Sequence, residues 1–179
     1  MRLGYTEFYK TKSMNIKYYK SIIVLFVAGL IVSLVSCNPA AKYEKAEKES
    51  ISNYLNTHIT DTFALESSGL YFRDVVVGTG LQPQVHDTAY VLYTGKFLEG
   101  TIFDTNTNPG DKQLIFPVGE GLMIVGFDEG ITYMKAGGKA QLLVPSSLGY
   151  GTQGFYSISG YTPLLYEVEL VKVVPGPGK

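Results

Sequence analysis

Residues 91–104 read Val-Leu-Tyr-Thr-Gly-Lys-Phe-Leu-Glu-Gly-Thr-Ile-Phe-Asp. An apolar run of strand-forming residues carries Tyr93, breaks at a glycine-containing turn, and returns through Phe103 into a single carboxylate, Asp104. Two aromatic side chains and one acid are therefore expected within reach of one another, with no nucleophile and no group of metal ligands beside them. We interpret this stretch as one wall of an apolar groove.

The composition favours one globular domain with appendages. The chain has 179 residues, of which 45% are hydrophobic and 17% charged, a balance that supports a packed core. Residues 1–36 hold five basic residues and one acid, whereas residues 37–179 hold ten basic and fifteen acidic residues, a formal charge of −5. Without a basic excess, the globular part is not expected to bind nucleic acid.

Cysteine and histidine are too scarce for the usual thiol and metal chemistry. Cys37 is the only cysteine, which excludes an internal disulfide and a cysteine-rich metal site. His58 and His86 lie far apart in the sequence, and neither has a histidine partner four residues away. Two unrelated surface histidines are the simpler interpretation, with a metal site as the alternative. We therefore expect no metal ion and no other cofactor.

The N-terminal segment has the pattern of a cleaved leader. A short basic region at residues 14–20 precedes an apolar run at residues 22–35, which is short for a membrane span and suits a signal peptide. The run ends in Leu-Val-Ser followed by Cys37, which resembles the lipobox of bacterial lipoproteins. We expect residues 1–36 to be a lipoprotein signal peptide, with Met14 as an alternative start, and Cys37 to carry lipid.

Lipid chains on Cys37 would anchor the protein to a membrane through their buried methylene groups. The globular part would then lie outside the cytoplasm, in the bacterial cell envelope. The alternative is an uncleaved membrane anchor with an incidental cysteine.

Residues 37–68 are expected to form a tether that contains a helix at about residues 42–56. Apolar residues recur there at steps of three and four, and Glu44 and Lys48 form a favourable i, i+4 pair. Such a helix is marginal alone, so its apolar stripe should dock on a surface. Two interpretations remain open: a spacer helix that packs on its own domain, and an arm for dimerisation or partner binding.

The segment 69–174 alternates short strand patterns with turns, and residues 175–179 follow as a C-terminal tail. One segment differs, because Phe127, Ile131 and Met134 fall on one face of a short helix. We predict an α+β fold, in which an antiparallel, strongly curved sheet of about five strands wraps around this helix, preceded by the N-terminal helix. The expected strands are residues 70–77, 88–98, 113–118, 139–144 and 164–174.

Two further patterns bear on the site. The loop at residues 146–163 is long and contains three tyrosines, so it is expected to be ordered and functional. Alternation in the last strand predicts one largely apolar face, made by Leu164, Tyr166, Val168, Leu170 and Lys172.

Together these segments resemble the FKBP-type peptidyl-prolyl cis-trans isomerases over residues 69–173. The similar segments are Val91–Gly95 with Gly100–Asp104, Phe116–Gly119 with Met123–Gly130, Met134–Ala140 with Val144 and Pro145, Leu148–Gly151, and Leu165–Leu170.

The resemblance implies a role for each matching position. Asp104 and Tyr150 would be the catalytic polar groups at the rim of the groove. Ile124 would also offer its backbone N–H to the substrate, and Ile158 would form the apolar tip of the long loop. The substrate-binding positions implied are Tyr93, Phe103, Leu114, Phe116, Met123, Ile124, Phe127, Ile158 and Tyr166.

The sequence also departs from the family pattern. The floor of the family's pocket is often tryptophan, and Phe127 stands there instead. Residues 105–113 contain no arginine to pair with Asp104, which leaves Tyr150 as its expected partner. Ser159 and Gly160 replace a Pro-Pro pair that many members have.

The resemblance implies isomerisation of Xaa-Pro bonds in exported proteins, so the expected partners are proline-containing polypeptides. The first alternative is a non-catalytic chaperone or binding module with the same groove. The second is a structural lipoprotein that has kept the fold without a groove function.

Overall fold

The computed structural model describes residues 39–178, of which residues 40–178 belong to one compact unit. The predicted signal peptide and the predicted lipidation at Cys37 lie outside the described residues. The elements, in chain order, are α2 (Pro39–Thr57), β1 (Ala64–Leu65), β2 (Tyr71–Val76), β3 (Thr88–Phe97), β4 (Ile102–Thr105), β5 (Leu114–Pro117), α3 (Val125–Tyr133), β6 (Gly138–Val144), the 3₁₀ helix η1 (Ser146–Leu148) and β7 (Leu164–Val174).

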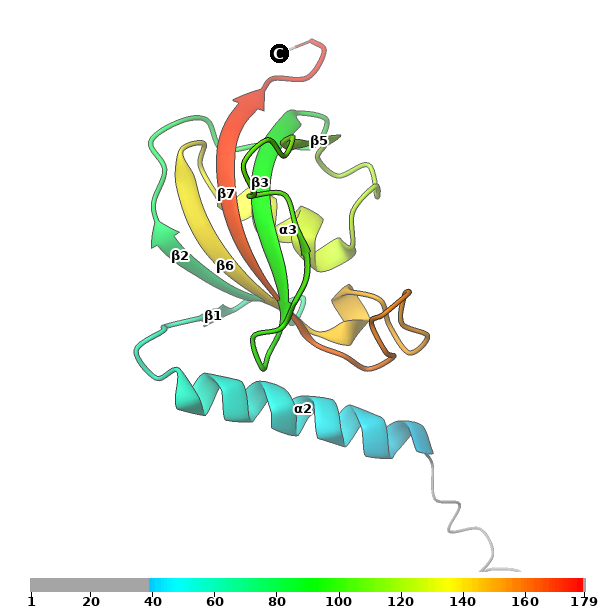
Figure 1. Ribbon diagram of the computed structural model, residues 1–179. Coiled ribbons are helices and arrows are strands. Elements are labelled where there is room, and N and C mark those ends of the chain that lie inside the picture. The colour runs from blue at the N-terminus through cyan, green and yellow to red at the C-terminus, as the bar shows by residue number, and fades with distance from the viewer. Residues whose placement is uncertain (1–38, 179) are drawn as a thin grey trace, which may run out of the picture. The chain divides into compact units, whose positions relative to one another are not determined.

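The described strands form one antiparallel sheet in the order β1-β2-β6-β7-β3-β4, and β5 pairs with β3 beside β4 (Figure 1). The predicted antiparallel α+β fold is confirmed. All five predicted strands are present, and β1 and β4 are additional. The four residues of β4 alternate between exposed and half-buried positions, so they carry little of the hydrophobic pattern that identifies a strand.

Helix α3 packs against the sheet through the face that the sequence predicts. Phe127, Ile131 and Met134 are 3%, 0% and 1% exposed. Close approach to β6 requires the glycine at position 130, because a Cβ atom there would come within 2.6 Å of the Leu142 side chain. The helix is therefore held close under the centre of the sheet, where its side chains reach the inner faces of β3 and β7.

Strand β7 departs from the expected alternation near its end. Leu170 pairs with Val91, but the next pair joins Lys172 to Tyr90, so the register shifts at this point. A bulge of this kind reverses the faces of the residues that follow it. Lys172 is therefore exposed, with its Nζ 5.4 Å from the centre of the Tyr90 ring, and Val173 turns into the core.

Helix α2 covers the predicted helix at residues 42–56 and begins three residues earlier. Its two buried residues, Ile51 and Tyr54, pack against Leu143 of β6 and Leu165 of β7. The apolar stripe of the helix thus contacts its own domain, as in the first of the two interpretations. Among the described residues, no helix is both long and apolar enough to span a membrane.

Candidate functional site

A cavity of about 430 Å³ opens on the face of the sheet that α3 covers. The sheet, the start of α3 and the loop after η1 each contribute side chains to it. Its lining residues are Tyr93, Asp104, Leu114, Leu122, Met123, Ile124, Phe127, Tyr150, Phe155 and Tyr166.

Strand register brings the aromatic residues of this cavity together. Tyr93 pairs with Val168, and Gly95 pairs with Tyr166, so the two tyrosines share the inner face of neighbouring strands. A Cβ atom at position 95 would come within 2.6 Å of the Phe103 ring and 3.1 Å of the Tyr166 ring. Because residue 95 is glycine, the Phe103 and Tyr166 rings have space to pack against each other.

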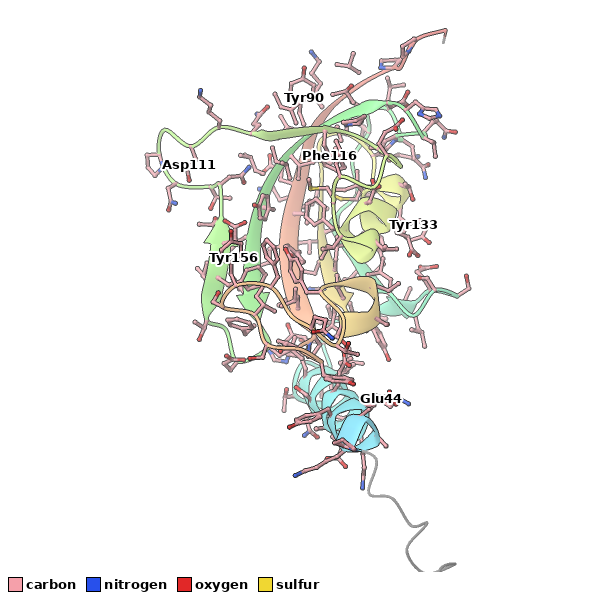
Figure 2. The ribbon with its side chains drawn as sticks, turned by 90° about the vertical axis from the view of Figure 1, so that its right-hand side faces the viewer. Glu44, Tyr90, Asp111, Phe116, Tyr133 and Tyr156 are labelled. Carbon is pink, nitrogen blue, oxygen red and sulfur yellow. The ribbon has the colours of Figure 1, made fainter. Side chains whose placement is uncertain are left out.

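Phe127 forms the floor of the cavity. Its ring centre lies 5.6 Å from that of Tyr93 and 5.2 Å from that of Tyr166, both with edge-on geometry. Phe116 packs behind it at 6.1 Å, between the sheet and α3 (Figure 2). Edge-on packing is a geometry that aromatic pairs prefer, and here it gives the cavity an apolar base made of contacting rings.

The carboxylate of Asp104 is held by Tyr93. The Tyr93 hydroxyl donates a hydrogen bond of 2.5 Å to Asp104 Oδ2. Burial raises the pKa of the Tyr93 phenol, and the hydrogen bond to Asp104 raises it further. The expectation that Asp104 depends on Tyr150 alone is therefore wrong. Tyr93 is the closer partner because it lies on β3, next to the strand that carries Asp104.

Tyr150 pairs with Tyr166 instead. Burial, followed by the charge and hydrogen bond of Tyr150, raises the pKa of the Tyr166 phenol. Tyr166 is 5% exposed, whereas Tyr150 is half-buried at the edge of the cavity. The Tyr166 phenol therefore stays protonated at neutral pH, and the polar side-chain groups at this edge are tyrosine hydroxyls and the carboxylate of Asp104.

A stack of three aromatic rings borders the open side. Tyr150 and Phe155 lie parallel with ring centres 5.1 Å apart, and Tyr156 meets Phe155 edge-on at 4.5 Å. Phe155 is 53% exposed and Tyr156 is 94% exposed. This stack extends the apolar surface of the cavity outward along the loop.

The structure brings most of the sequence-predicted site residues into contact with this cavity. The three that do not line it are Phe103, Phe116 and Ile158, which belong to the surrounding core or pack against it. Ile158 is 5% exposed, and its backbone bonds to that of Phe155 in both directions. The exposed apolar residue of the loop at the cavity is therefore Phe155 rather than Ile158.

Sequence reasoning missed two lining residues, Leu122 and Phe155. Each directly follows a glycine with positive φ, Gly121 at 69° and Gly154 at 72°. Such a glycine turns the backbone sharply and projects the next side chain from the loop. This context alone does not identify a site residue, because Leu70 also follows a glycine with positive φ, Gly69, and lies in the core.

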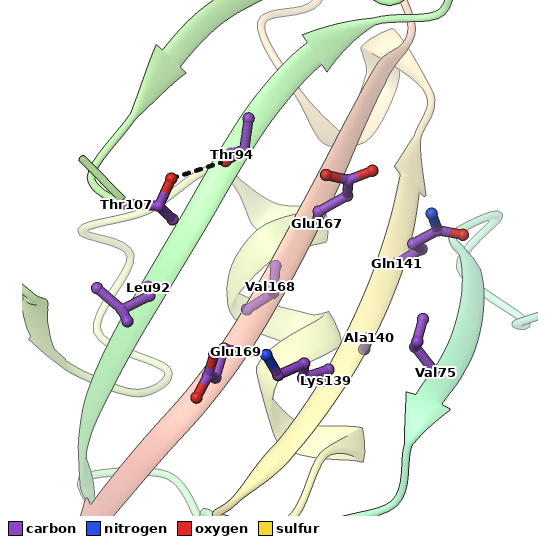
Figure 3. A pocket seen from close by; sticks show the side chains of 10 residues that line it. All are labelled: Val75, Leu92, Thr94, Thr107, Lys139, Ala140, Gln141, Glu167, Val168 and Glu169. Carbon is purple, nitrogen blue, oxygen red and sulfur yellow. Dashed lines mark hydrogen bonds and ion pairs between the residues drawn. The ribbon is translucent and has the colours of Figure 1, made fainter. Parts of the chain in front are cut away.

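A second hollow lies on the opposite face of the sheet (Figure 3). Its side chains are largely polar, and Lys139 pairs there with Glu169 at 3.0 Å. Thr94 hydrogen-bonds Thr107 at 3.4 Å, as Figure 3 shows. None of the predicted site residues lines this hollow. The aromatic cavity is therefore the candidate functional site.

A family model described as FKBP-type peptidyl-prolyl cis-trans isomerase matches residues 80–171. The chain belongs to this family. All residues that line the aromatic cavity lie within the matched range.

Relatives and solved structures agree with the family. The chain is 35% identical to the FKBP-type 22 kDa peptidyl-prolyl cis-trans isomerase of Escherichia coli over 73% of this chain and 57% of that protein. A crystal structure of a peptidyl-prolyl cis-trans isomerase from Pseudomonas syringae matches with a TM-score of 0.65 and 26% identity, covering 78% of this chain and 99% of that one.

The crystal structure of FkpA from Escherichia coli matches with a TM-score of 0.64 and 28% identity, covering 86% of this chain and 73% of that one. The chain spans about half the length of the curated relatives it matches, with 57% and 50% covered for the first two.

Proposed function

We propose that this chain is a peptidyl-prolyl cis-trans isomerase acting on Xaa-Pro bonds of exported proteins. The observation that carries the proposal is the aromatic cavity: its floor, Phe127, is apolar and packed edge-on against two tyrosine rings, and its polar groups are confined to the edge. A cavity of about 430 Å³ has room for a proline ring and its neighbouring groups.

The reaction needs no bond to be broken. The barrier to rotation about a peptide bond is roughly 18–20 kcal/mol, and it arises from amide resonance. A site lowers this barrier when it binds the twisted amide more tightly than either planar form. Apolar walls remove water from the imide carbonyl, and this loss of hydrogen bonds disfavours the polar resonance form that resists rotation.

The polar residues have distinct roles in this mechanism. Asp104, oriented by Tyr93, faces the bound amide at one edge, and Tyr150 contacts the substrate at the other. Ile124 is the N-cap of α3, and no acceptor among the described residues takes its backbone N–H. That N–H is free to donate to a substrate carbonyl, which would fix the direction of the bound chain.

A protease-coupled assay with Xaa-Pro peptides tests the activity. We expect the purified chain to accelerate isomerisation, and Asp104→Ala and Tyr150→Phe each to lower kcat/KM about tenfold, a loss of about 1.4 kcal/mol. Matched controls are Asp111→Ala and Tyr156→Phe, which remove the same groups outside the cavity lining (Figure 2). Unchanged rates in both site variants would refute the assignment.

The same assay decides between catalysis and simple binding. A chain that suppresses aggregation of an unfolded protein but gives no rate above background would be a chaperone and not an isomerase. The family membership and the intact aromatic cavity favour the isomerase.

We further propose that the chain is a lipoprotein of the bacterial cell envelope, anchored through Cys37. The sequence supports this through the basic start, the apolar run at residues 22–35 and the cysteine that follows it. In a bacterial host, Cys37→Ala is expected to change the gel mobility of the protein and release it from the membrane fraction. A Cys37→Ala protein that still sediments with membranes would contradict the lipid anchor.

A further inference from the structure

One carboxylate of helix α2 holds the start of the loop that carries Tyr150. Glu47 accepts a hydrogen bond from the backbone N–H of Ser146 at 2.5 Å and another from the Ser146 hydroxyl at 2.7 Å. The two residues are 99 positions apart in the sequence, and Ser146 is 5% exposed. Ser146 is the first residue of η1, and its preceding residue, Pro145, provides no side-chain cap. Glu47 supplies that cap from outside the loop.

Ser146 in turn fixes the backbone on both sides of Tyr150. Its carbonyl oxygen accepts the N–H of Gly149 at 2.9 Å and the N–H of Gly151 at 2.7 Å. The Tyr150 carbonyl accepts the N–H of Gly154 at 3.1 Å, which continues the ordered turn toward Phe155. The bonds from Glu47 to Ser146 and from Ser146 to the two glycines therefore form one continuous chain that ends at Tyr150.

Helix α2 contacts the same loop at a second point. The rings of Tyr43 and Tyr161 stack with centres 5.4 Å apart and planes 18° apart. Tyr161 also donates its backbone N–H to the carbonyl of Gly151 at 2.9 Å. Tyr43 and Glu47 are four residues apart, so they lie on one face of the helix. This face thus holds the two ends of the loop around Tyr150.

We propose that Glu47 is a positioning residue for the proline-binding cavity: its carboxylate, through Ser146, keeps Tyr150 and the Phe155 ring stacked on it at the edge of the site. This inference rests on the proposed function, because it assigns α2 a part in the activity of that cavity. The helix that follows the predicted anchor then belongs to the isomerase site as well as to the tether.

The chemistry of the contact predicts which substitutions matter. A carboxylate accepts both hydrogen bonds of Ser146, and bonds to a charged acceptor are the stronger kind. Glutamine at position 47 keeps one acceptor for the N–H and offers an amide N–H to the hydroxyl oxygen, so it preserves the contact. Alanine leaves the buried N–H of Ser146 without its partner.

Hydrogen exchange in the full-length chain tests the contact without reference to activity. In Glu47→Ala, the amides of Gly149 and Gly151 should exchange at least tenfold faster than in the unchanged chain, while those of β6 and β7 keep their rates. Glu47→Gln should stay within about twofold of the unchanged chain. Glu44→Ala is the matched control, because Glu44 is an exposed acid on the same helix (Figure 2). Equal exchange in Glu47→Ala and Glu44→Ala would overturn the proposal.

The isomerase assay then tests the functional part. We expect Glu47→Ala to lower kcat/KM about tenfold and Glu47→Gln to restore most of it. In a Tyr150→Ala background, Glu47→Ala should have little further effect, because its action passes through Tyr150. Ile51→Ala provides a stability control, since it removes buried contact between α2 and the sheet without touching the loop.

Failure of the proposed function and failure of the positioning role of Glu47 give different results in these experiments. Absence of isomerase activity in the unsubstituted chain would refute the proposed function and with it the assignment of Glu47 to the isomerase site. The hydrogen-exchange result would still show whether Glu47, through Ser146, holds the loop that carries Tyr150. A tenfold loss in Glu47→Ala that persists in the Tyr150→Ala background would overturn the positioning role.

Discussion

The hydroxyl of Tyr93 donates a 2.5 Å hydrogen bond to Asp104, and the two residues lie 11 positions apart on neighbouring strands. No arginine is available between Thr105 and Gln113 to hold this carboxylate. The phenol takes that place, and burial keeps it protonated by raising its pKa. The tyrosine of β3 thus has two functions, since its ring lines the cavity and its hydroxyl orients the acid.

Replacing Tyr93 by phenylalanine tests this second function. The ring and its contact with Phe127 remain, but Asp104 loses the donor that orients it. We expect kcat/KM to fall about fivefold, equivalent to about 1 kcal/mol, the typical contribution of one hydrogen bond. Tyr90→Phe is the control, because Tyr90 lies on the same strand but does not line the cavity. Equal kcat/KM in the two variants would show that the Tyr93 hydroxyl does not contribute to the action of Asp104.

The buried phenols predict how stability depends on alkaline pH. Burial raises the pKa of both Tyr93 and Tyr166 in the folded chain, whereas tyrosines in the unfolded chain ionise at about pH 10. Their contribution to stability is complete below about pH 10 and is lost as the pH rises toward the folded values. For Tyr166 alone, the unfolding free energy should fall by up to about 1.4 kcal/mol per pH unit in this range.

Urea unfolding between about pH 9 and pH 12 measures this slope. Tyr166→Phe should give a shallower decline than the unchanged chain, because it removes one of the two shifted groups. Tyr156→Phe removes a phenol that is 94% exposed and should leave the slope as it is. A Tyr166→Phe chain with the original slope would contradict the link between its burial and stability.

The sequence predicted the sheet and helix well because they depend on local periodicity. The spacing of Phe127, Ile131 and Met134 defines the face of α3 that is buried, and long apolar runs mark the central strands. The bulge near Val171 was not predictable from alternation, because nothing in its side chain distinguishes it from its neighbours. The register shift is visible only in the pairing of β7 with Tyr90 and Val91 of β3.

The candidate site also divides into residues that local pattern predicts and contacts that it does not. Aromatic residues on the strands and α3 were placed by pattern and resemblance, and most of them line the cavity. Contacts between distant segments escaped prediction, because sequence spacing carries no information on which hydroxyl or carboxylate meets which. The pairing of Glu47 with Ser146, 99 positions apart, is of this type. Tyr93 and Asp104 were expected within reach of one another, but the hydrogen bond between them was not predicted.

Gly95 provides a test of the close packing behind the site. An alanine there would bring its Cβ within 2.6 Å of the Phe103 ring, too close for both to stay in place. We expect Gly95→Ala to lower the unfolding free energy by about 1–3 kcal/mol, as overpacking of a core typically does. Adding Phe103→Leu should recover part of this loss, measured by chemical denaturation. A double variant no more stable than Gly95→Ala would place the strain elsewhere.

A tryptophan at position 127 would report directly on the floor of the cavity. The chain has no tryptophan, so Phe127→Trp introduces a single indole fluorophore. The larger ring should cost about 1–3 kcal/mol of stability where it presses on Tyr93 and Tyr166, and it should make the cavity shallower. Binding of a proline peptide should then change the indole emission, because the peptide would displace water next to that ring.

Phe72→Trp is the control, since Phe72 is buried against Tyr133 and does not line the cavity. If both variants respond equally to the peptide, or if neither responds at peptide concentrations that saturate any isomerase activity of the chain, Phe127 is not the surface on which the proline ring rests.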